Sequence, residues 1–351
     1  MKELILKNVT LFDGRVTDVI TQDGKIVSVS KTDKNGKDCT GMILTSGLID
    51  IHTHGCIGYD ASEGGLREMS RHLLPLGVTS WLPTTTTMPL DVISAATKNL
   101  PEQGEDEARI IGYHMEGPFL NAEYCGAQKP EWLLPADAAF VNDHPHIKLV
   151  TVAPETEGAL EEIKKMNAAV ALGHSAADYD TAMKAFEAGA KCLTHTFNAM
   201  APLHHRKPSL IGAAFDANAY AQVISDGIHM HPATVRVLYR LFGADRIILI
   251  SDSIRATDLA DGEYAFGGHT ITVKDGSARL PDGTLAGSTV TLPICVERAI
   301  SFGIPPKDAY KMASETPAAM LGLKKGKIEV GYDAEFLLLD TSYKICEVII
   351  G

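Results

Sequence analysis

Cysteine is scarce and scattered in this chain of 351 residues. Its six cysteines form no C-x-x-C pair and stand far apart, at positions 39, 56, 125, 192, 295 and 346. This spacing excludes a zinc site built on paired thiolates and argues against a disulfide framework. It is typical of a protein kept in a reducing cytoplasm, which is the location we expect.

Positive charge is also in short supply. Lys and Arg total 32 against 44 Asp and Glu, which gives a formal net charge of −12. No basic field attracts nucleic acid or an anionic membrane, so we expect neither as a partner. An anionic small molecule can bind only in a local pocket. The first residues, "MKELILKNVTLFDG", hold no long apolar run, and we expect neither a signal peptide nor a transmembrane helix.

Both ends of the chain alternate apolar and polar residues, as half-buried strands do. The stretches "ELILKNVTLF" and "KIVSVS" show this pattern near the N-terminus, with turn signals at Asp13-Gly14 and Asp23-Gly24. "GKIEVGYDAEFLLLD" and "KICEVII" repeat it near the C-terminus. We therefore predict a small β-sandwich domain built from residues 1–46 and 326–351.

The middle of the chain, residues 47–325, has a different rhythm. Eight short apolar runs each end in polar residues and are followed by helix-like segments, at 47–54, 78–85, 109–118, 147–155, 169–175, 192–200, 221–229 and 246–253. Strands that alternate with helices indicate a parallel sheet. Eight such units predict an α/β fold with a (β/α)₈ barrel, a fold of about 250 residues.

Polar residues that suit a metal stand where these runs end. They are His52, His54, Glu116, His174, His195, His229 and Asp252. A barrel would bring them to one mouth, because active sites of this fold lie at the C-terminal ends of the strands. Imidazole and carboxylate suit zinc or another divalent first-row ion, which lowers the pKa of bound water to roughly 7.

Each of these residues also has an ordinary interpretation. His52 and His54 could be hydrogen-bonded histidines at a strand end, and Asp252 could cap a helix. Glu116 could be a loop carboxylate. Taken singly, these interpretations match or outweigh the functional one. Taken together, they require that unrelated polar residues stand by chance at the end of several different strands. A shared site is therefore the better hypothesis.

The order of motifs resembles a known family. A β segment that runs into "GLIDIHTHG", with lone His, His and Asp at later strand ends, resembles the amidohydrolase superfamily. More specific are "HMEGPFLN", "LGHS", "THTFNAMAPLHHRKP", "SDGIH" and "SDS", in that order. Together they resemble the N-acetylglucosamine-6-phosphate deacetylases within it. The resemblance runs from Asp50 through "GKIEVGYDAEFLLLD", nearly the full chain.

The resemblance implies one or two divalent metal ions per chain. Glu116, His174 and His195 would hold the main ion. His52 and His54 would hold a second ion, with Glu116 bridging the two. Zinc is favoured, and iron(II) also suits these ligands.

The resemblance also implies a reaction and a substrate. Asp252 would be the general acid/base that activates a metal-bound water, and N-acetyl-D-glucosamine 6-phosphate would yield D-glucosamine 6-phosphate and acetate in amino-sugar catabolism. Related enzymes complete the phosphate pocket with a neighbouring subunit, so a homodimer is expected. The implied substrate contacts are Asn198, the Ala199 N–H and Arg206 at the phosphate, and His229 at a sugar hydroxyl.

One position departs from the family. Gln128, in "CGAQKP", stands where some relatives have a histidine that helps to polarise the substrate carbonyl. Glutamine can donate a hydrogen bond but cannot carry the charge of a proton. One hypothesis is that a second metal takes over that role, since the pair His52 and His54 is present.

Three alternatives remain open. The first is a deacetylase for the galactosamine epimer of the sugar phosphate. The second is another amidohydrolase, such as a dihydroorotase-like ring-opening enzyme with a carbamylated lysine on the fourth strand. Lys148 argues against it, because it lies near the start of that strand and not at its mouth. The third is a non-catalytic scaffold, which the presence of every expected ligand disfavours.

Overall fold

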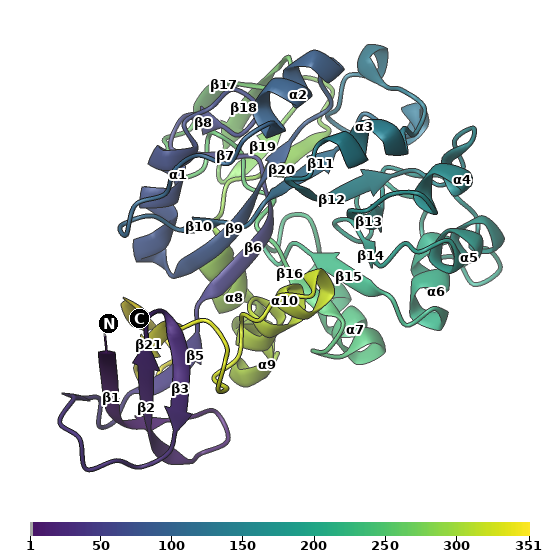
Figure 1. Ribbon diagram of the computed structural model, residues 1–351. Helices are drawn as coiled ribbons and strands as arrows, with labels where there is room; N and C mark the ends of the chain where they lie inside the picture. Colours follow the sequence, from purple (N-terminus) through teal and green to yellow (C-terminus); the bar gives the residue numbers. More distant parts are fainter. Residues whose placement is uncertain (1–2) are drawn as a thin grey trace.

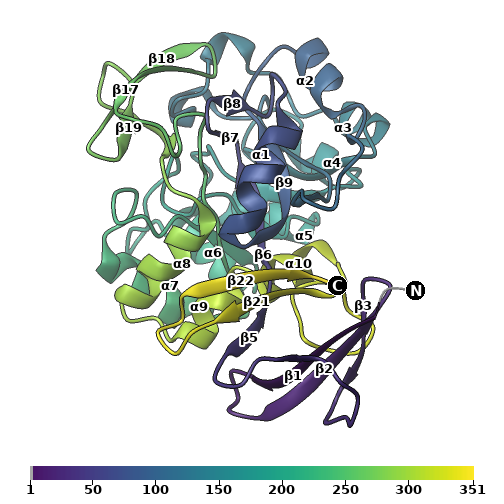
Figure 2. The same cartoon turned by 90° about the vertical axis from the view of Figure 1, so that its left-hand side faces the viewer.

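The computed structural model describes residues 3–351. It contains a parallel barrel wrapped by helices and, beside it, a smaller sheet to which both ends of the chain contribute (Figures 1 and 2). The barrel strands are β6 (Leu48–Thr53), β9 (Val78–Thr85), β11 (Tyr113–Glu116), β12 (Ile147–Val152), β13 (Ala169–Leu172), β14 (Cys192–Leu193), β15 (Tyr220–Val223) and β16 (Ile247–Leu249). Seven of the eight predicted runs contain one of these strands, and the run at 221–229 begins one residue inside β15, which confirms the α/β prediction.

The pairing of the strands is parallel from β6 through β9 and onward to β16. A short strand, β10 (Arg109–Ile110), pairs with β9 just before β11. The first and last barrel strands meet only at their C-terminal ends. There Thr53 forms a parallel bridge with Ser253, and the Asp252 N–H donates to the His52 carbonyl at 2.9 Å. The barrel is therefore nearly closed, and its last contact lies at the mouth.

The interior of the barrel explains why the runs are apolar without alternation. All eight residues of β9 are buried, since a strand inside a barrel has one face on the interior and one on the helices. Ile49, Leu82, Leu149 and Ile248 belong to the cluster that fills the interior. The barrel is thus a packed core, and side chains of the mouth rest on it.

Helices follow the strands and cover the outside of the barrel (Figure 1). The α-helices are α1 (Leu66–Leu73), α2 (Leu90–Thr97), α3 (Ala138–Asp143), α4 (Ala159–Ile163), α5 (Tyr179–Glu187), α6 (Ser209–Asp216), α7 (Pro232–Phe242), α8 (Leu292–Ser301), α9 (Pro306–Met312) and α10 (Glu315–Leu321). Short 3₁₀ turns lie at Leu74–Leu76, Ala122–Tyr124 and Pro130–Trp132. No helix between residues 3 and 351 is both long enough and apolar enough to cross a bilayer.

Strands from the two chain ends form one seven-stranded sheet. They are β1 (Glu3–Thr10), β2 (Val16–Gln22), β3 (Lys25–Val29), β4 (Lys37–Asp38), β5 (Ile43–Ser46), β21 (Glu335–Leu339) and β22 (Ile345–Ile350). β21 pairs antiparallel with β5, with Phe336 opposite Ser46. Leu6, Leu44 and Phe336 are buried together. The joining of the two ends in one sheet agrees with the sequence pattern, while the sandwich form stays a prediction.

An antiparallel insertion follows the last barrel strand, and the sequence analysis did not anticipate it. It consists of β17 (Gly262–Phe266), β18 (His269–Lys274), β19 (Ser277–Arg279) and β20 (Leu285–Ser288). The available signals were the Gly267-Gly268 turn and the alternating "HTITVK" that follows it. Two further short strands, β7 (Gly55–Cys56) and β8 (Tyr59–Asp60), form a hairpin directly after the first barrel strand.

Candidate active site

Three of the predicted site residues have an unusual backbone conformation directly beyond their strands. His174, His195 and Asp252 have φ values of 48°, 24° and 51°. Residues other than glycine rarely adopt positive φ, and such strain collects at functional sites. Each residue lies two or three positions beyond the end of its strand, so its side chain no longer follows the β alternation at the mouth of the barrel.

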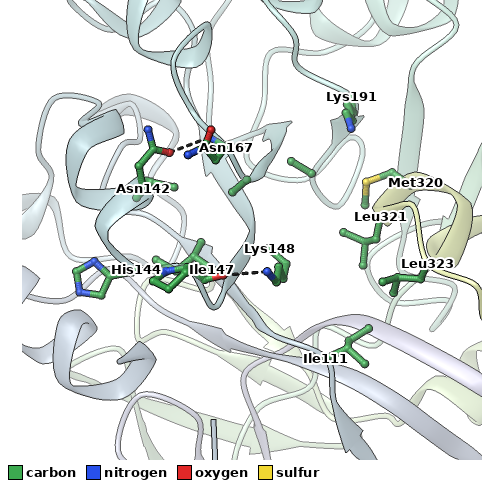
Figure 3. Close-up of a pocket in the computed structure, with 14 residues that line it drawn as sticks. Ile111, Asn142, His144, Ile147, Lys148, Asn167, Lys191, Met320, Leu321 and Leu323 are labelled. Carbon is green, nitrogen blue, oxygen red and sulfur yellow. Dashed lines mark hydrogen bonds between the residues drawn. The ribbon is translucent and has the colours of Figure 1, made fainter. Parts of the chain in front are cut away.

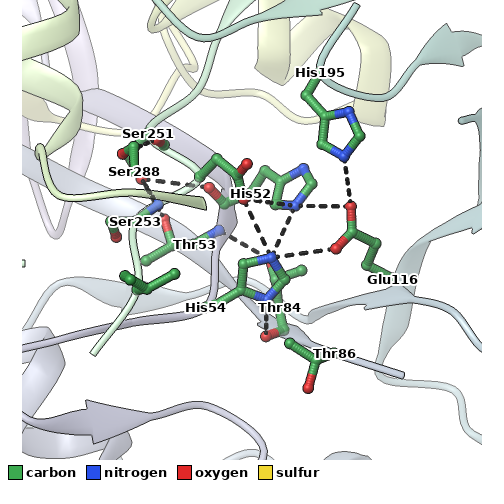
Figure 4. A network of polar contacts seen from close by, with 12 residues as sticks. His52, Thr53, His54, Thr84, Thr86, Glu116, His195, Ser251, Ser253 and Ser288 are labelled. Carbon is green, nitrogen blue, oxygen red and sulfur yellow. Dashed lines mark hydrogen bonds and ion pairs between the residues drawn. The ribbon is translucent and has the colours of Figure 1, made fainter. Parts of the chain in front are cut away.

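Glu116 lies at the centre of the predicted ligands. His52 and His54 approach it from the first strand, with Nε2 atoms 3.4 Å from Oε1 and 3.3 Å from Oε2. His174 and His195 approach from the fifth and sixth strands, with Nε2 atoms 3.2 Å and 2.9 Å from Oε1. Figure 4 shows the rings of His52, His54 and His195 directed at the carboxylate. One carboxylate thus joins two pairs of imidazoles.

Asp252 lies on the side of the histidine pair. Its Oδ1 is 3.3 Å from His52 Nε2 and 3.2 Å from His54 Nε2. Two carboxylates therefore share the same pair of rings. His114 lies two residues before Glu116 on β11 and packs against His52, with the two ring centroids 4.5 Å apart. Its Nε2 is 2.8 Å from Thr151 Oγ1.

The ring nitrogens that face away from the centre identify the tautomers. Three Nδ1 atoms lie beside backbone carbonyls: His54 at 3.1 Å from Thr84, His174 at 2.9 Å from Tyr124, and His195 at 3.2 Å from Asn198. A carbonyl oxygen only accepts, so Nδ1 carries the proton and Nε2 of a neutral ring offers a lone pair to the centre. Lone pairs that converge on carboxylates repel one another unless a cation lies between them. The donor set therefore fits a divalent ion.

The ionisation of the same residues points the same way. Burial disfavours the charged form of His54, but Asp252 and Glu116 outweigh it and raise its pKa to about 10. Burial also opposes charge on Glu116, yet the surrounding imidazoles hold its pKa well below the usual range. The pKa of Asp252 is lowered as well, against its burial, by His52 and His54. The site therefore favours positive charge at its centre.

Two groups of side chains are close enough to share an ion. One consists of His52, His54 and Glu116, and the other of Glu116, His174 and His195. Within each group the ligand atoms lie within 4.8 Å of one another. The structure thus brings together all five predicted metal ligands, and Glu116 belongs to both groups.

A cavity of about 320 Å³ opens above these residues. Its lining includes every predicted site residue except His52 and Arg206, namely His54, Glu116, Gln128, His174, His195, Asn198, Ala199, His229 and Asp252. The β17–β20 insertion contributes Phe266, Leu285 and Gly287. The Phe266 ring lies 5.5 Å from that of His54, at an interplanar angle of 81°. The insertion therefore forms one wall of the cavity.

Gln128 is bonded at both ends of its amide. Its Nε2 donates to Glu116 Oε2 at 2.7 Å, and its Oε1 accepts the Thr87 N–H at 2.6 Å. It therefore helps to orient the central carboxylate, while its expected contact with a substrate carbonyl stays a prediction.

His229 has a buried partner that the sequence analysis did not identify. The His229 Nδ1 lies 2.7 Å from Asp226 Oδ2, and Asp226 Oδ1 accepts the backbone N–H groups of Ile228 and His229 at 2.9 and 2.8 Å. Burial opposes charge on His229, but Asp226 raises its pKa. The available signal was the acid three residues before the histidine in "SDGIH".

Arg206 lies elsewhere. Its side chain is exposed, its Nη1 is 2.7 Å from His205 Nε2, and it lines a separate hollow beside α5 and α6. Within one chain, the structure therefore does not bring Arg206 together with the other predicted substrate contacts. Asn198 and Ala199 do line the cavity, and Ala199 has a φ of 48°.

The opposite end of the barrel has a hollow of similar size but different character (Figure 3). Its lining includes Ile147 and Ala169, which begin β12 and β13, so it lies at the amino-terminal ends of the strands. Lys148 in this hollow donates to the Pro145 carbonyl at 2.9 Å. Neither of the two ligand groups described above includes a residue of this hollow. The convergent chemistry thus lies at the carboxyl end.

A parallel barrel with carboxylate and imidazole ligands at its carboxyl mouth defines the class of metal-dependent barrel hydrolases. Residues 43–350 match the amidohydrolase family, and the chain belongs to that family. It is a metal-dependent amide hydrolase.

Named relatives are similar over nearly the whole chain. The chain is 36% identical to the N-acetylglucosamine-6-phosphate deacetylase of Bacillus subtilis, over 99% of this chain and 91% of the relative. It is 35% identical to the N-acetylgalactosamine-6-phosphate deacetylase of Escherichia coli O157:H7, over 95% and 92%. A variant of the N-acetyl-D-glucosamine-6-phosphate deacetylase of Mycobacterium smegmatis, solved with N-acetyl-D-glucosamine-6-phosphate, superposes with a TM-score of 0.91 at 27% identity, covering 99% and 98%.

Proposed function

We propose that this chain hydrolyses N-acetyl-D-glucosamine 6-phosphate to D-glucosamine 6-phosphate and acetate, a step of amino-sugar catabolism. The observation that carries this proposal is the position of Glu116 between two pairs of imidazoles, with Asp252 beside one pair at the floor of the cavity. The names of the relatives support the choice of substrate.

The metal sites follow from the two groups around Glu116. Glu116, His174 and His195 would hold the main ion, and His52 and His54 would hold a second ion with Glu116 between them. Zinc suits this donor set, and iron(II) is the alternative. A bound divalent ion supplies Lewis acidity toward water and toward the amide carbonyl.

Asp252 moves the proton in this proposal. Its lowered pKa makes it a carboxylate at neutral pH, so it is ready to accept a proton from the attacking water. It then gives that proton to the nitrogen of the breaking amide bond, because an unprotonated amine is a very poor leaving group. Its place beside His52 and His54 puts it within reach of water at the metal ligands.

The substrate contacts lie around the wall of the cavity. Asn198 and the N–H of Ala199 would bind the phosphate, since amide donors suit its oxygens. His229 would donate from Nε2 to a sugar oxygen, because Asp226 occupies its Nδ1 and raises its pKa. Gln128 would donate to the substrate only if it released Glu116.

Arg206 is proposed to act from a second subunit of a homodimer. Its exposed guanidinium does not line the cavity of its own chain, which leaves it free to reach a neighbouring one. Mixing Arg206→Ala with Asp252→Asn subunits tests this. If Arg206 acts across the dimer, one site of each mixed dimer regains both groups. Because half of the dimers in an equimolar mixture are mixed, about a quarter of the wild-type activity returns. If Arg206 acts within its own chain, no activity returns.

The domain limits are part of the proposal. Residues 47–325 form the catalytic barrel, and residues 1–46 with 326–351 form the small β domain, a sandwich in our prediction. We place the reaction in the cytoplasm, since all six cysteines are free thiols, which suits a reducing compartment.

The deciding experiment is acetate release from N-acetylglucosamine 6-phosphate by protein whose metal content has been counted. Fast release that a chelator abolishes and added zinc restores would support the proposal. The galactosamine epimer is assayed in parallel, because one relative at 35% identity bears that name. Preference for that epimer would move the assignment to it, and no release from either by the metal-loaded protein would overturn the proposal.

A further inference from the structure

Gln222 is a buried side chain below the mouth of the barrel. It belongs to β15 and is 0% exposed. Its Oε1 lies 3.0 Å from His52 Nδ1 and 3.4 Å from the backbone nitrogen of His195. It does not line the cavity, so it does not meet a substrate there. One amide oxygen thus contacts a residue from each of the two proposed ion groups.

These contacts determine which way the amide lies. The backbone N–H of His195 can only donate, so the amide atom beside it is the oxygen. The same oxygen can only accept, so His52 must carry its proton on Nδ1. His52 Nε2 then offers its lone pair to the centre. In the reverse orientation, the amide N–H would face the His195 N–H, and His52 would present a proton to the position of the ion.

His52 is the exception among the four histidine ligands. The Nδ1 atoms of His54, His174 and His195 rest on backbone carbonyls, which no substitution of the acceptor residue removes. His52 alone rests on a side chain. The tautomer of this one ligand therefore depends on the identity of a single residue.

We propose that Gln222 is the positioning residue that sets the tautomer of His52 and so allows the second ion to bind. This inference rests on the proposed function, because it requires ions at both groups. Gln222 acts through His52 and touches neither substrate nor the reacting atoms. Contacts of this kind to metal-bound histidines change metal affinity by about 10- to 100-fold.

The nitrogen end of the Gln222 amide makes it possible to test its positioning role apart from an effect on folding. Gln222 Nε2 is buried and has no hydrogen-bond partner within residues 3–351. A buried donor without a partner is unfavourable. A methionine of similar length would remove this donor together with the acceptor. We therefore expect Gln222→Met to fold with a melting temperature close to that of the wild type, while its metal binding changes.

The experiment measures ion affinity in place of turnover. Zinc per chain is counted at graded free zinc, by competition with a chromophoric chelator, for the wild type, Gln222→Met, Gln222→Leu and Gln222→Glu. The wild type should bind two ions. In the Met and Leu variants the affinity for one ion should fall 10- to 100-fold and the other should stay unchanged. Gln222→Glu should restore the second ion, because its carboxylate still accepts from His52.

Thr151→Val is the matched control. Thr151 is also fully buried inside the barrel and also contacts a histidine, His114, but that histidine belongs to neither ligand group. The Thr151→Val variant should bind both ions with the affinities of the wild type. Two ions bound with unchanged affinity in both Gln222→Met and Gln222→Leu would overturn the inference. So would a wild type that binds one ion only, while a wild type that binds none would overturn the proposed function itself.

Discussion

Gln128 donates a hydrogen bond of 2.7 Å to Glu116, and the opposite end of its amide is fixed to the Thr87 N–H at 2.6 Å. Glu116 is the carboxylate shared by both ligand groups, so this contact orients the residue on which both depend. Gln128, which stands where some relatives carry a histidine, therefore both lines the cavity and contacts the proposed metal centre.

Gln128→Leu tests this relationship. Loss of the donor leaves Glu116 Oε2 without its amide partner, and we expect zinc affinity to fall about 10- to 100-fold, with kcat falling alongside. Zinc titration and steady-state kinetics measure the two effects. Gln103→Leu is the control. The Gln103 amide is also hydrogen-bonded at both ends, to the carbonyl and the N–H of Ile110, but it does not line the cavity. Unchanged zinc affinity in Gln128→Leu would refute the orienting role.

Asp252→Asn tests the acid/base. The amide keeps the size of the side chain but cannot take a proton from water, and we expect kcat to fall by about 10²- to 10⁴-fold. The zinc count and the dissociation constant of the substrate should change little. Equilibrium binding and single-turnover kinetics separate these quantities. Near-normal turnover would show that another group transfers the proton.

His52→Ala tests whether the second ion takes part in catalysis. The variant should lose one of the two ions, keep the ion at Glu116, His174 and His195, and become inactive. Elemental analysis and acetate release on the same sample provide the measurement. Unchanged activity with one ion lost would mean that the histidine pair is a binding site without a catalytic role.

The pH dependence of KM tests the pair of His229 and Asp226. Burial lowers the pKa of His229, but Asp226 outweighs it and, with a smaller contribution from Asp252, raises that pKa. The imidazolium is thus present at low pH and is lost as pH rises through the raised pKa, so KM should rise with it. In Asp226→Asn the rise should begin at lower pH. Superimposable profiles would contradict the role of Asp226.

Asp18 in the terminal sheet tests stability apart from catalysis. Although burial opposes its charge, the backbone N–H groups of Asn8 and Thr32, at 2.9 and 2.8 Å, help to lower its pKa to about 2. Because the folded pKa lies below the unfolded value of about 3.9, its stabilising effect is complete above that value and disappears as pH falls toward 2.

Asp18→Asn should therefore destabilise the protein at neutral pH by about 1–3 kcal/mol and flatten the loss of stability in acid. Denaturant unfolding at several pH values measures this. Acetate release should equal that of the wild type, since Asp18 lies on β2, outside the barrel. Equal stability of variant and wild type at neutral pH would contradict the prediction.

Local pattern was sufficient for the eight barrel strands. The stretch "VTSWLPTT" became β9 with every residue buried, because a strand enclosed on both faces needs no polar side. The β17–β20 insertion was missed because its signals, Gly267-Gly268 and a short alternating run, were weaker than those of the eight barrel runs that precede it.

The sequence by itself determined which residue types stand at the ends of the strands, and hence the proposed ligand set around Glu116. Only the tertiary structure decided the partners of these residues. Closure of the barrel brings Asp252 to His52, and the register of β15 puts Gln222 beneath the same ring. The segment between β14 and α6 holds Arg206 outside the cavity. Such contacts join residues far apart in the chain, and local propensity contains no information about them because they arise only when distant strands pack together.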